Sequence, residues 1–137
     1  MSLTIQPVET AFFHQTWPLV EGFIDSAMKW GDGDYTMDQV KALLAKGNWL
    51  LLVAVDEDKT IHGAATVEFN NMPNARVAFI TAIGGKLISS KDTYAQMCAI
   101  LKNFGATTIQ GAARKSVARL WHRYGFEERY IIVEAQL

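Results

Sequence analysis

The feature that most constrains the fold is a run near the C-terminal end, in which two strand-like segments flank a short amphipathic helix. The first segment, residues 107–113 (TTIQGAA), and the last, Tyr130–Val133, are rich in β-branched and apolar residues, as is typical of buried strands. Between them, residues 116–126 (SVARLWHRYGF) have helical spacing of apolar side chains. Gly125 stands where a helix commonly ends in a left-handed residue. The order strand, helix, Gly-Phe, strand therefore predicts an α/β fold.

The short helix has two distinct faces. On a helical wheel its apolar face carries Val117, Leu120, Trp121 and Tyr124, and the opposite face carries Arg119, His122 and Arg123. The residue after Gly125, Phe126, is expected to turn the chain back into the core. We therefore expect Leu120, Trp121 and Phe126 to be mostly buried, and Arg119 and Arg123 to be exposed.

The rest of the chain predicts further strands and helices in a definite order. Apolar alternation and short apolar runs predict strands at Leu3–Val8, Trp49–Val55, Ile61–Phe69 and Arg76–Ile83. Spacing, caps and stop signals predict helices over Phe12–Trp30 with a break near Pro18, from Thr36 to Gly47, and from Ser90 or Asp92 to Gly105. Polar turns at 56–59 and 70–74 join the middle strands. The sequence thus predicts one α/β (α+β) domain over residues 1–137, with a mixed, mostly antiparallel, twisted sheet of about six strands flanked by helices.

Composition excludes several classes of function. The net charge is −1 with no block of like charges, so no nucleic-acid partner is expected. The longest apolar run, Trp49–Val55, is too short to span a bilayer, and no signal peptide is visible. The single cysteine, Cys98, precludes an intrachain disulfide and suits a reducing, cytoplasmic setting. No group of His, Cys and acidic residues has metal-ligand spacing, so no metal is expected.

The C-terminal run resembles the ending of the GNAT N-acetyltransferase superfamily, whose last helix commonly reads Asn-x-x-Ala-x-x-Leu-Tyr-x-x-x-Gly-Phe. The predicted element order is also that of the superfamily over nearly the whole chain. The resemblance implies an acyl-CoA N-acyltransferase fold and acetyl transfer from acetyl-CoA to an amine. Its partners would be acyl-CoA and a small-molecule or protein amine, without nucleic acid or membrane, and a homodimer is an open alternative to a monomer.

A second resemblance leaves the enzymatic interpretation open. The stretches RVAFITAIGG, GATTIQGAARKSVARLW and GF-x-ERY-x-IVE are also similar to small GNAT-like proteins of bacteriophages and prophages. This implies an alternative in which the protein is catalytically inactive and has a binding or structural role, in a virion or in interaction with a host. In that case the protein would be virion-associated rather than simply cytoplasmic.

In the superfamily, the cofactor lies where the fourth strand and the next strand splay apart. The pantetheine arm would pair with backbone groups of Ile80, Ala82 and Ile83, and the pyrophosphate would lie at the following helix N-terminus, in a loop Arg/Gln-x-x-Gly-x-Gly/Ala. Here that loop reads GGKLISSKDTYAQM, and its two glycines come too far before the expected start of the helix to match the pattern. The candidate contacts are Gly84, Gly85, Lys86, Ser90, Lys91 and Arg114. Alternatively, Gly84-Gly85 ends a strand and Ser90 caps a helix. With few backbone donors, any acetyl-CoA binding should be weak and salt-dependent.

The resemblance also assigns candidate catalytic residues. Trp121 stands where the superfamily usually has the tyrosine acid, and an indole N–H does not supply a proton at neutral pH. Tyr124, three residues on, is the candidate acid, with a core aromatic as the alternative. For the base that accepts a proton from the amine, Glu68 is the nearest candidate, and the others are His14, Asp32 and Asp34.

Overall fold

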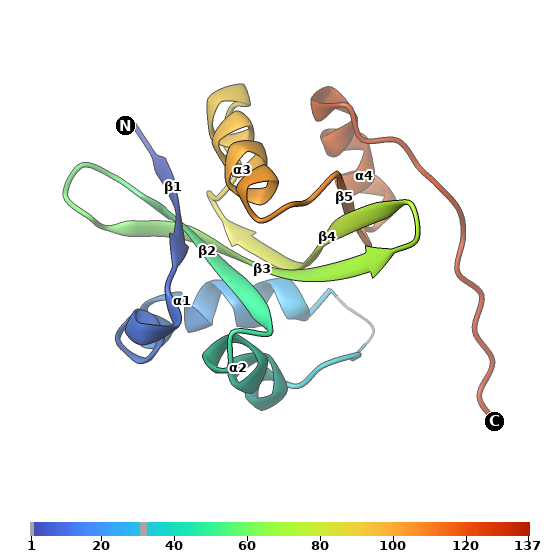
Figure 1. Cartoon of the computed structure of the whole chain (residues 1–137), viewed down its shortest axis with the longest axis horizontal. Helices are drawn as coiled ribbons and strands as arrows, with labels where there is room; N and C mark the ends of the chain where they lie inside the picture. The colour runs from blue at the N-terminus through green and yellow to red at the C-terminus, as the bar shows by residue number, and fades with distance from the viewer. Residues whose placement is uncertain (1, 31–32) are drawn as a thin grey trace.

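The computed structural model describes residues 2–30 and 33–137, which form one five-stranded sheet covered by helices on both faces (Figure 1). The strands are β1 (Thr4–Val8), β2 (Trp49–Val55), β3 (Ile61–Met72), β4 (Ala75–Gly85) and β5 (Thr108–Gly111). They lie in chain order across the sheet. Strands β1 to β4 are antiparallel, and β5 is parallel to β4. The predicted mixed, mostly antiparallel sheet is thereby confirmed.

Four α-helices and two short 3₁₀ helices complete the described part of the chain. They are η1 (Thr10–Phe12), α1 (Phe13–Met28), α2 (Met37–Ala45), α3 (Lys91–Asn103), α4 (Lys115–Trp121) and η2 (His122–Tyr124). Helix α1 runs unbroken through Pro18, so the predicted break is wrong. Pro18 is on the exposed side of the helix, where water can satisfy the carbonyl that loses its N–H partner. Among the described residues, no helix is long and apolar enough to cross a membrane.

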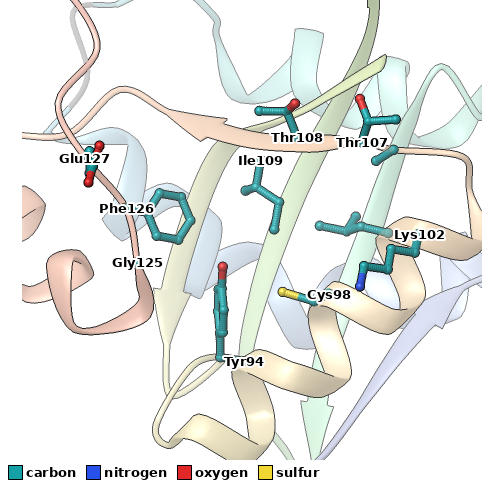
Figure 2. A pocket seen from close by; sticks show the side chains of 11 residues that line it. Tyr94, Cys98, Lys102, Thr107, Thr108, Ile109, Gly125, Phe126 and Glu127 are labelled. Atoms are coloured by element: carbon teal, nitrogen blue, oxygen red, sulfur yellow. The ribbon is translucent and has the colours of Figure 1, made fainter. Parts of the chain in front are cut away.

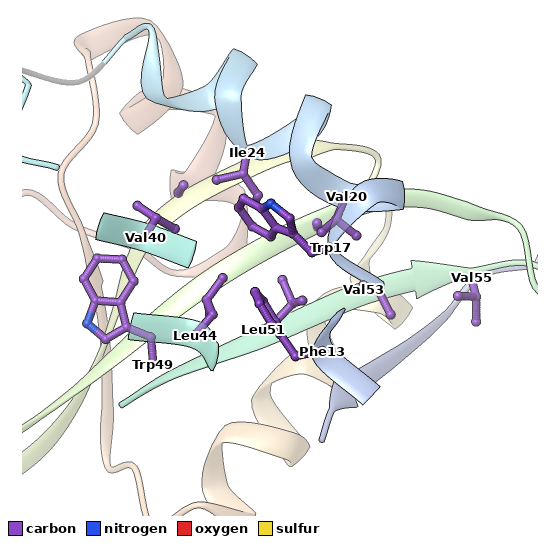
Figure 3. Packing of buried hydrophobic residues seen from close by; sticks show 12 residues of the cluster. Phe13, Trp17, Val20, Ile24, Val40, Leu44, Trp49, Leu51, Val53 and Val55 are labelled. Carbon is purple, nitrogen blue, oxygen red and sulfur yellow. The ribbon is translucent and has the colours of Figure 1, made fainter. Parts of the chain in front are cut away.

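Two hydrophobic clusters hold the helices against the sheet. On one face, the α1 and α2 side chains pack on β2, β3 and β4 (Figure 3), and the cluster includes Phe13, Trp17, Val20, Ile24, Val40, Leu44, Trp49 and Leu51. On the other face, Met97 and Leu101 of α3 pack on residues of β1 to β4, such as Ile5 and Leu52. Because β2 alternates between the two clusters at Leu51 and Leu52, it is buried on both sides, as its continuous apolar run predicts.

A β-bulge interrupts β4 at Thr81. Val67 pairs with Ile80 and Thr66 pairs with Ala82, which leaves Thr81 as the extra residue. The Thr81 hydroxyl donates to the Thr66 carbonyl at 3.0 Å, and the two threonine Oγ1 atoms are 2.6 Å apart. The bulge shifts the alternation of β4, because Ile80 belongs to the α3-side cluster and Ala82 to the α1-side cluster. The direction of β4 therefore changes just where its pairing with β5 stops.

Two predictions about strands differ from the structure. Strand β3 continues to Met72, so Pro73 and Asn74 alone form the turn that was predicted over 70–74. Residues 130–133 form no strand, and their side chains are exposed. The sheet thus has five strands rather than about six. The reason is that a β-branched segment becomes a strand only where an edge pairs with it, and no described residue pairs with this one.

The β2–β3 turn carries a pH-sensitive contact. His62 Nε2 is 2.7 Å from Asp56 Oδ2, and the amides of Asp58 and Thr60 donate to Asp56 Oδ1. The hydrogen bond from His62, with help from the two amides, lowers the pKa of the Asp56 carboxyl below its usual value of 3.8. The folded chain therefore binds this proton less readily than the unfolded chain does. This stabilisation is present above the usual pKa and is lost as the pH falls through the folded value.

We expect Asp56→Asn to lower the free energy of unfolding near neutral pH by more than it does at about pH 3. The amide retains an oxygen for the two turn N–H groups, so the variant isolates the charge. Urea denaturation of both proteins across this pH range measures the difference. A difference that stays constant with pH would contradict the assignment.

Candidate functional site

Strands β4 and β5 diverge at Ile80. Strand β5 pairs with β4 only over Val77–Ile80, and β4 then continues to Gly85. Beyond the bulge, no described strand pairs with the outer edge of β4. Backbone N–H and C=O groups along such an edge are available to a ligand in extended conformation. The splayed strands that the sequence resemblance implied are thus present.

An open hollow lies beside this free edge of β4. Its volume is about 330 Å³, comparable to the smaller ligand sites of proteins. It is lined by Ile83, Gly85, Ile88, Ser89, Val117, Leu120, Trp121, Arg123 and Tyr124. The end of β4 and the loop before α3 form one wall, and α4 with η2 forms the other. The hollow therefore joins the two segments in which the sequence placed most site candidates.

The apolar side of α4 lines the hollow, and Trp121 on that side also packs against the α3-side cluster. Leu120 is 57% exposed, and Trp121 and Phe126 are only partly buried, so the expectation that all three are mostly buried is wrong. Arg119 and Arg123 are exposed, as expected. Periodicity identified the apolar side correctly, but it does not show whether another element covers that side. The uncovered Leu120, and Val117 beside it, are site residues that the sequence reasoning missed.

Aromatic packing fixes Tyr124 at the edge of the hollow. Its ring stacks on Tyr94 of α3, with centroids 4.9 Å apart and 25° between the planes. Trp121 lies edge-on to Phe126 at 4.7 Å. Burial, followed by a hydrogen bond with Cys98, raises the pKa of Tyr94 to about 12, so Tyr94 keeps its proton at neutral pH. Tyr124 therefore packs against α3 and also lines the hollow.

Glu68 lies on the opposite side of the sheet. Its antiparallel partner, Trp49, belongs to the cluster under α1 and α2, and directly paired residues share a face. Tyr35, at the entrance to α2, stacks edge-on to Trp49 at 4.8 Å. Burial, and then the charges of Glu68 and Asp34, raise the pKa of Tyr35. Glu68, Asp34 and Tyr35 thus form a partly exposed acidic and aromatic group, separate from the residues that line the hollow.

The other two candidate bases are placed differently. His14 is exposed on α1, edge-on to Phe13, and it does not line the hollow. Asp32 lies outside the described residues. Within residues 2–30 and 33–137, no three His, Cys, Asp or Glu side chains are grouped so that they could hold a metal ion.

Close packing accounts for the two glycines that end β4. A Cβ atom on Gly84 would overlap the carbonyl oxygen of Phe23 in α1, and Gly85 has a φ of +65° and would place a Cβ 2.5 Å from the carbonyl oxygen of His62. The following amide, of Lys86, donates to that His62 carbonyl at 2.8 Å. Ile80 and Ala82 are buried on opposite faces, so neither side chain is open to a ligand. Ile80 still pairs with Gly111 of β5, whereas the backbone groups of Ala82 lie beyond that pairing, on the free edge.

A capping box occupies the start of α3. The Ser90 hydroxyl accepts from the Thr93 amide, and Thr93 Oγ1 accepts from the amides of Ser89 and Ser90. Ser90 is therefore the N-cap, which is one of the two roles that the sequence left open. The first-turn amides of Lys91 and Asp92 have no intrahelical partner. The side chains of Lys86 and Lys91 are exposed, and they are the cations nearest in sequence to this helix end.

Arg114 contacts an aromatic ring outside the hollow. It is the N-cap residue of α4, and its guanidinium carbon is 3.8 Å from the centroid of the Trp30 ring. This distance is typical of a cation–π contact. Arg114 does not line the hollow, so contact with a ligand phosphate there would require it to leave Trp30.

Comparison with known proteins shows which fold this geometry belongs to. No protein-family model and no curated protein matches the sequence. Among solved structures, an aminoglycoside acetyltransferase (meta-AAC0020) from an uncultured soil metagenomic sample, in complex with sisomicin, has a TM-score of 0.69 at 16% identity, covering 98% of this chain and 96% of that one. A predicted acetyltransferase from Clostridium acetobutylicum with acetyl-CoA has a TM-score of 0.63 at 14% identity, covering 98% and 96%.

A third solved structure is also similar over the whole chain. An acetyltransferase from Trypanosoma brucei has a TM-score of 0.60 at 12% identity, covering 99% of this chain and 100% of that one. The chain thus has the GNAT acyl-CoA N-acyltransferase fold over nearly its whole length. At these identities the likeness establishes the fold, and activity has to be argued from the site.

Proposed function

We propose that the protein binds acetyl-CoA in the hollow between β4 and α4 and transfers the acetyl group to an amine. The observation that carries the proposal is an apolar helix side facing an unpaired strand edge. A ligand arm that contains both amides and methylene groups could contact both walls at once. Its amides would form hydrogen bonds with the edge of β4, and its methylene groups would cover Leu120. The same fold occurs in an acetyltransferase solved with acetyl-CoA.

Of the candidate binding residues, Ile83 and Gly85 line the hollow itself, and the others lie on the adjoining strand, loop and helix starts. Backbone groups of Ala82 and Ile83, continuing to Gly84 and Gly85, would pair with the pantetheine arm, starting just past Ile80, where the pairing with β5 ends. Lys86 and Lys91, with the first-turn amides after Ser90, would face the pyrophosphate, whereas Arg114 would join only on leaving Trp30. The capping box engages the amides of Ser89, Ser90 and Thr93, so side-chain charges must supply much of the phosphate binding.

The chemical roles are divided between the two faces of the sheet. Acetyl-CoA would supply the activated acyl group. Tyr124, which lines the hollow, would donate a proton to the leaving sulfur, which the Trp121 indole does not do. Glu68 would accept a proton from the incoming amine, with Asp34 adding negative charge that attracts a cation. The opening between β4 and β5 would join the acceptor side to the cofactor side.

A second candidate function is binding without turnover. The observations that favour it are the capping box, which engages the amides that would otherwise face a pyrophosphate, and the position of Glu68 across the sheet from Tyr124. In this case the protein would be a catalytically inactive member of the fold, with a binding or structural role in a virion or against a host target.

Calorimetric titration with acetyl-CoA, followed by a thiol-release assay with a panel of amines, tests the two candidates. We expect binding that weakens as salt is raised, because exposed lysine contacts are screened. Leu120→Glu should weaken binding about tenfold or more, since a buried leucine contributes about 1.5–3 kcal/mol. Arg119→Glu, on the exposed side of the same helix, is the matched control and should change it little.

Turnover separates the enzyme from the inactive protein. Tyr124→Phe retains the stack on Tyr94 and removes the hydroxyl, so it should lower kcat and leave acetyl-CoA binding nearly unchanged. Binding without thiol release from any amine would favour the second candidate. The absence of acetyl-CoA binding at low salt would contradict the proposal that the protein binds acetyl-CoA.

A further inference from the structure

The C-terminal segment is the largest exposed apolar feature of the described chain. After η2, residues 126–137 form no helix or strand. Tyr130, Ile131, Ile132 and Val133 are 71%, 87%, 81% and 88% exposed. In an extended chain these four side chains point alternately to two sides, so both sides are apolar, which is typical of a strand that is covered on both faces. Contiguous exposed apolar residues of this kind mark an interaction site.

The sheet ends in a free edge next to an uncovered hollow. Strand β5 pairs with β4 on one side, and no described residue pairs with its other side. Beside β5, between it and α3, lies a second hollow of about 320 Å³ (Figure 2). Its lining includes Tyr94, Cys98, Leu101, Lys102, Ile109 and Phe126. A strand added at this edge would find backbone partners and an apolar surface together.

The segment of the same chain does not occupy this edge. Phe126 is held in place by Trp121 and by Tyr94, at centroid distances of 4.7 and 6.0 Å. The residues that follow leave the sheet, and the chain ends away from β5 (Figure 1). Each copy therefore has an unpaired strand-like segment and an unpaired strand edge, and the two remain apart within one molecule.

We propose that residues 129–133 of one copy pair with the free edge of β5 in a second copy, and that the exchange is reciprocal. A reciprocal exchange gives a closed dimer with two-fold symmetry, in which both segments and both strand edges are paired. Charges of both signs are available on both partners, because Lys102 and Glu127 line the accepting hollow and the segment carries Arg129 between Glu128 and Glu134. The proposal does not depend on acetyl-CoA, which would bind in the other hollow.

The first test is the mass of the full-length protein in solution, measured by light scattering during size-exclusion chromatography. We expect twice the 15.3 kDa of one chain. The N–H groups of successive strand residues point to opposite sides, and proline removes one of them. Only one of residues 131 and 132 can therefore direct its N–H group toward β5. Of the variants Ile131→Pro and Ile132→Pro, one should have a dimer dissociation constant about tenfold or more above that of the other. Gln136→Pro, beyond the segment, is the control.

The second test uses side-chain chemistry and leaves the backbone intact. Cys98 is the only cysteine and lines the accepting hollow. A chain carrying Ile131→Cys and Cys98→Ala is mixed with the unaltered chain and treated with a short bismaleimide. We expect a cross-link between the two different chains. A chain carrying Ile131→Cys with Cys98 retained reports pairing within one molecule.

Three outcomes would overturn the proposal. The first is a monomer at all concentrations, whatever the state of the segment. The second is an intramolecular cross-link between Cys98 and residue 131 in a monomer, which would show that the segment folds back on its own β5. The third is a dimer that persists in both proline variants and gives no cross-link, which would place the interface elsewhere.

Discussion

Replacing Trp17 with alanine is expected to lower the free energy of unfolding by about 3–5 kcal/mol, the usual range for a buried large aromatic residue. Trp17 is only 5% exposed and packs beside Phe13 with ring centroids 5.6 Å apart. Figure 3 shows it between α1 and the strands, with Val20 and Ile24 on the same helix. Removing the indole would leave a cavity between α1 and the sheet, because close packing on both sides keeps either element from moving in to fill it.

Leu19→Ala provides the matched control within α1. Leu19 is 64% exposed, so its truncation should change the free energy of unfolding by no more than about 0.5 kcal/mol. Urea denaturation of the two variants and the parent chain measures both values. Similar losses for Trp17→Ala and Leu19→Ala would mean that α1 is rotated relative to the sheet.

Local patterns in the sequence were sufficient to predict most of the secondary structure. The run Trp49–Val55 is a strand with the predicted bounds, because its apolar continuity matches burial on both faces. The Thr36 and Ser90 caps begin α2 and α3, because a capping hydroxyl acts on amides within its own turn. Predictions of this kind need only the chemistry of neighbouring residues.

The errors concern features that depend on distant parts of the chain. The apolar side of α4 was correctly identified, but Leu120 is exposed, because an open hollow lies between α4 and the diverging β4. Residues 130–133 have strand composition, but no described strand of their own molecule pairs with them. In both cases the residue pattern predicts what the segment would bury, and the rest of the fold decides whether a partner is present.

The candidate site was predictable to a similar extent. The sequence placed the candidate site between the end of β4, the start of α3 and α4, since the resemblance supplied the element order, and a hollow lies between the end of β4, the loop before α3 and α4 in the structure. The sequence did not show that Glu68 lies on one face of the sheet and Tyr124 on the other. The face of a strand residue depends on strand register and on the bulge at Thr81, and neither can be read from the residue pattern alone. The importance of Gly63 was also missed, since a single glycine within a strand carries no clear signal in one sequence.

Gly63→Ala is expected to destabilise the protein by about 3 kcal/mol, near the upper end of the usual range for overpacking. A Cβ atom at this position would overlap the amide nitrogen of Leu87 and lie 2.8 Å from the backbone nitrogen and carbonyl carbon of Lys86. These are backbone atoms, so no side-chain rotation relieves the overlap. Leu87 is fully buried, and the Lys86 amide is bonded to His62, so the loop before α3 would have to shift as a unit.

Gly22→Ala is the matched control, and its expected effect has the opposite sign. Gly22 is exposed within α1, and a Cβ there would meet no atom within 4 Å. Alanine restricts the unfolded chain more than glycine does, so this variant should be more stable by about 0.5–1 kcal/mol. Denaturant midpoints of the two variants give both signs in one experiment. A stable Gly63→Ala protein would show that the loop between β4 and α3 is free to move away from β3, and acetyl-CoA titration of that variant would then show whether its position matters for the proposed phosphate contacts.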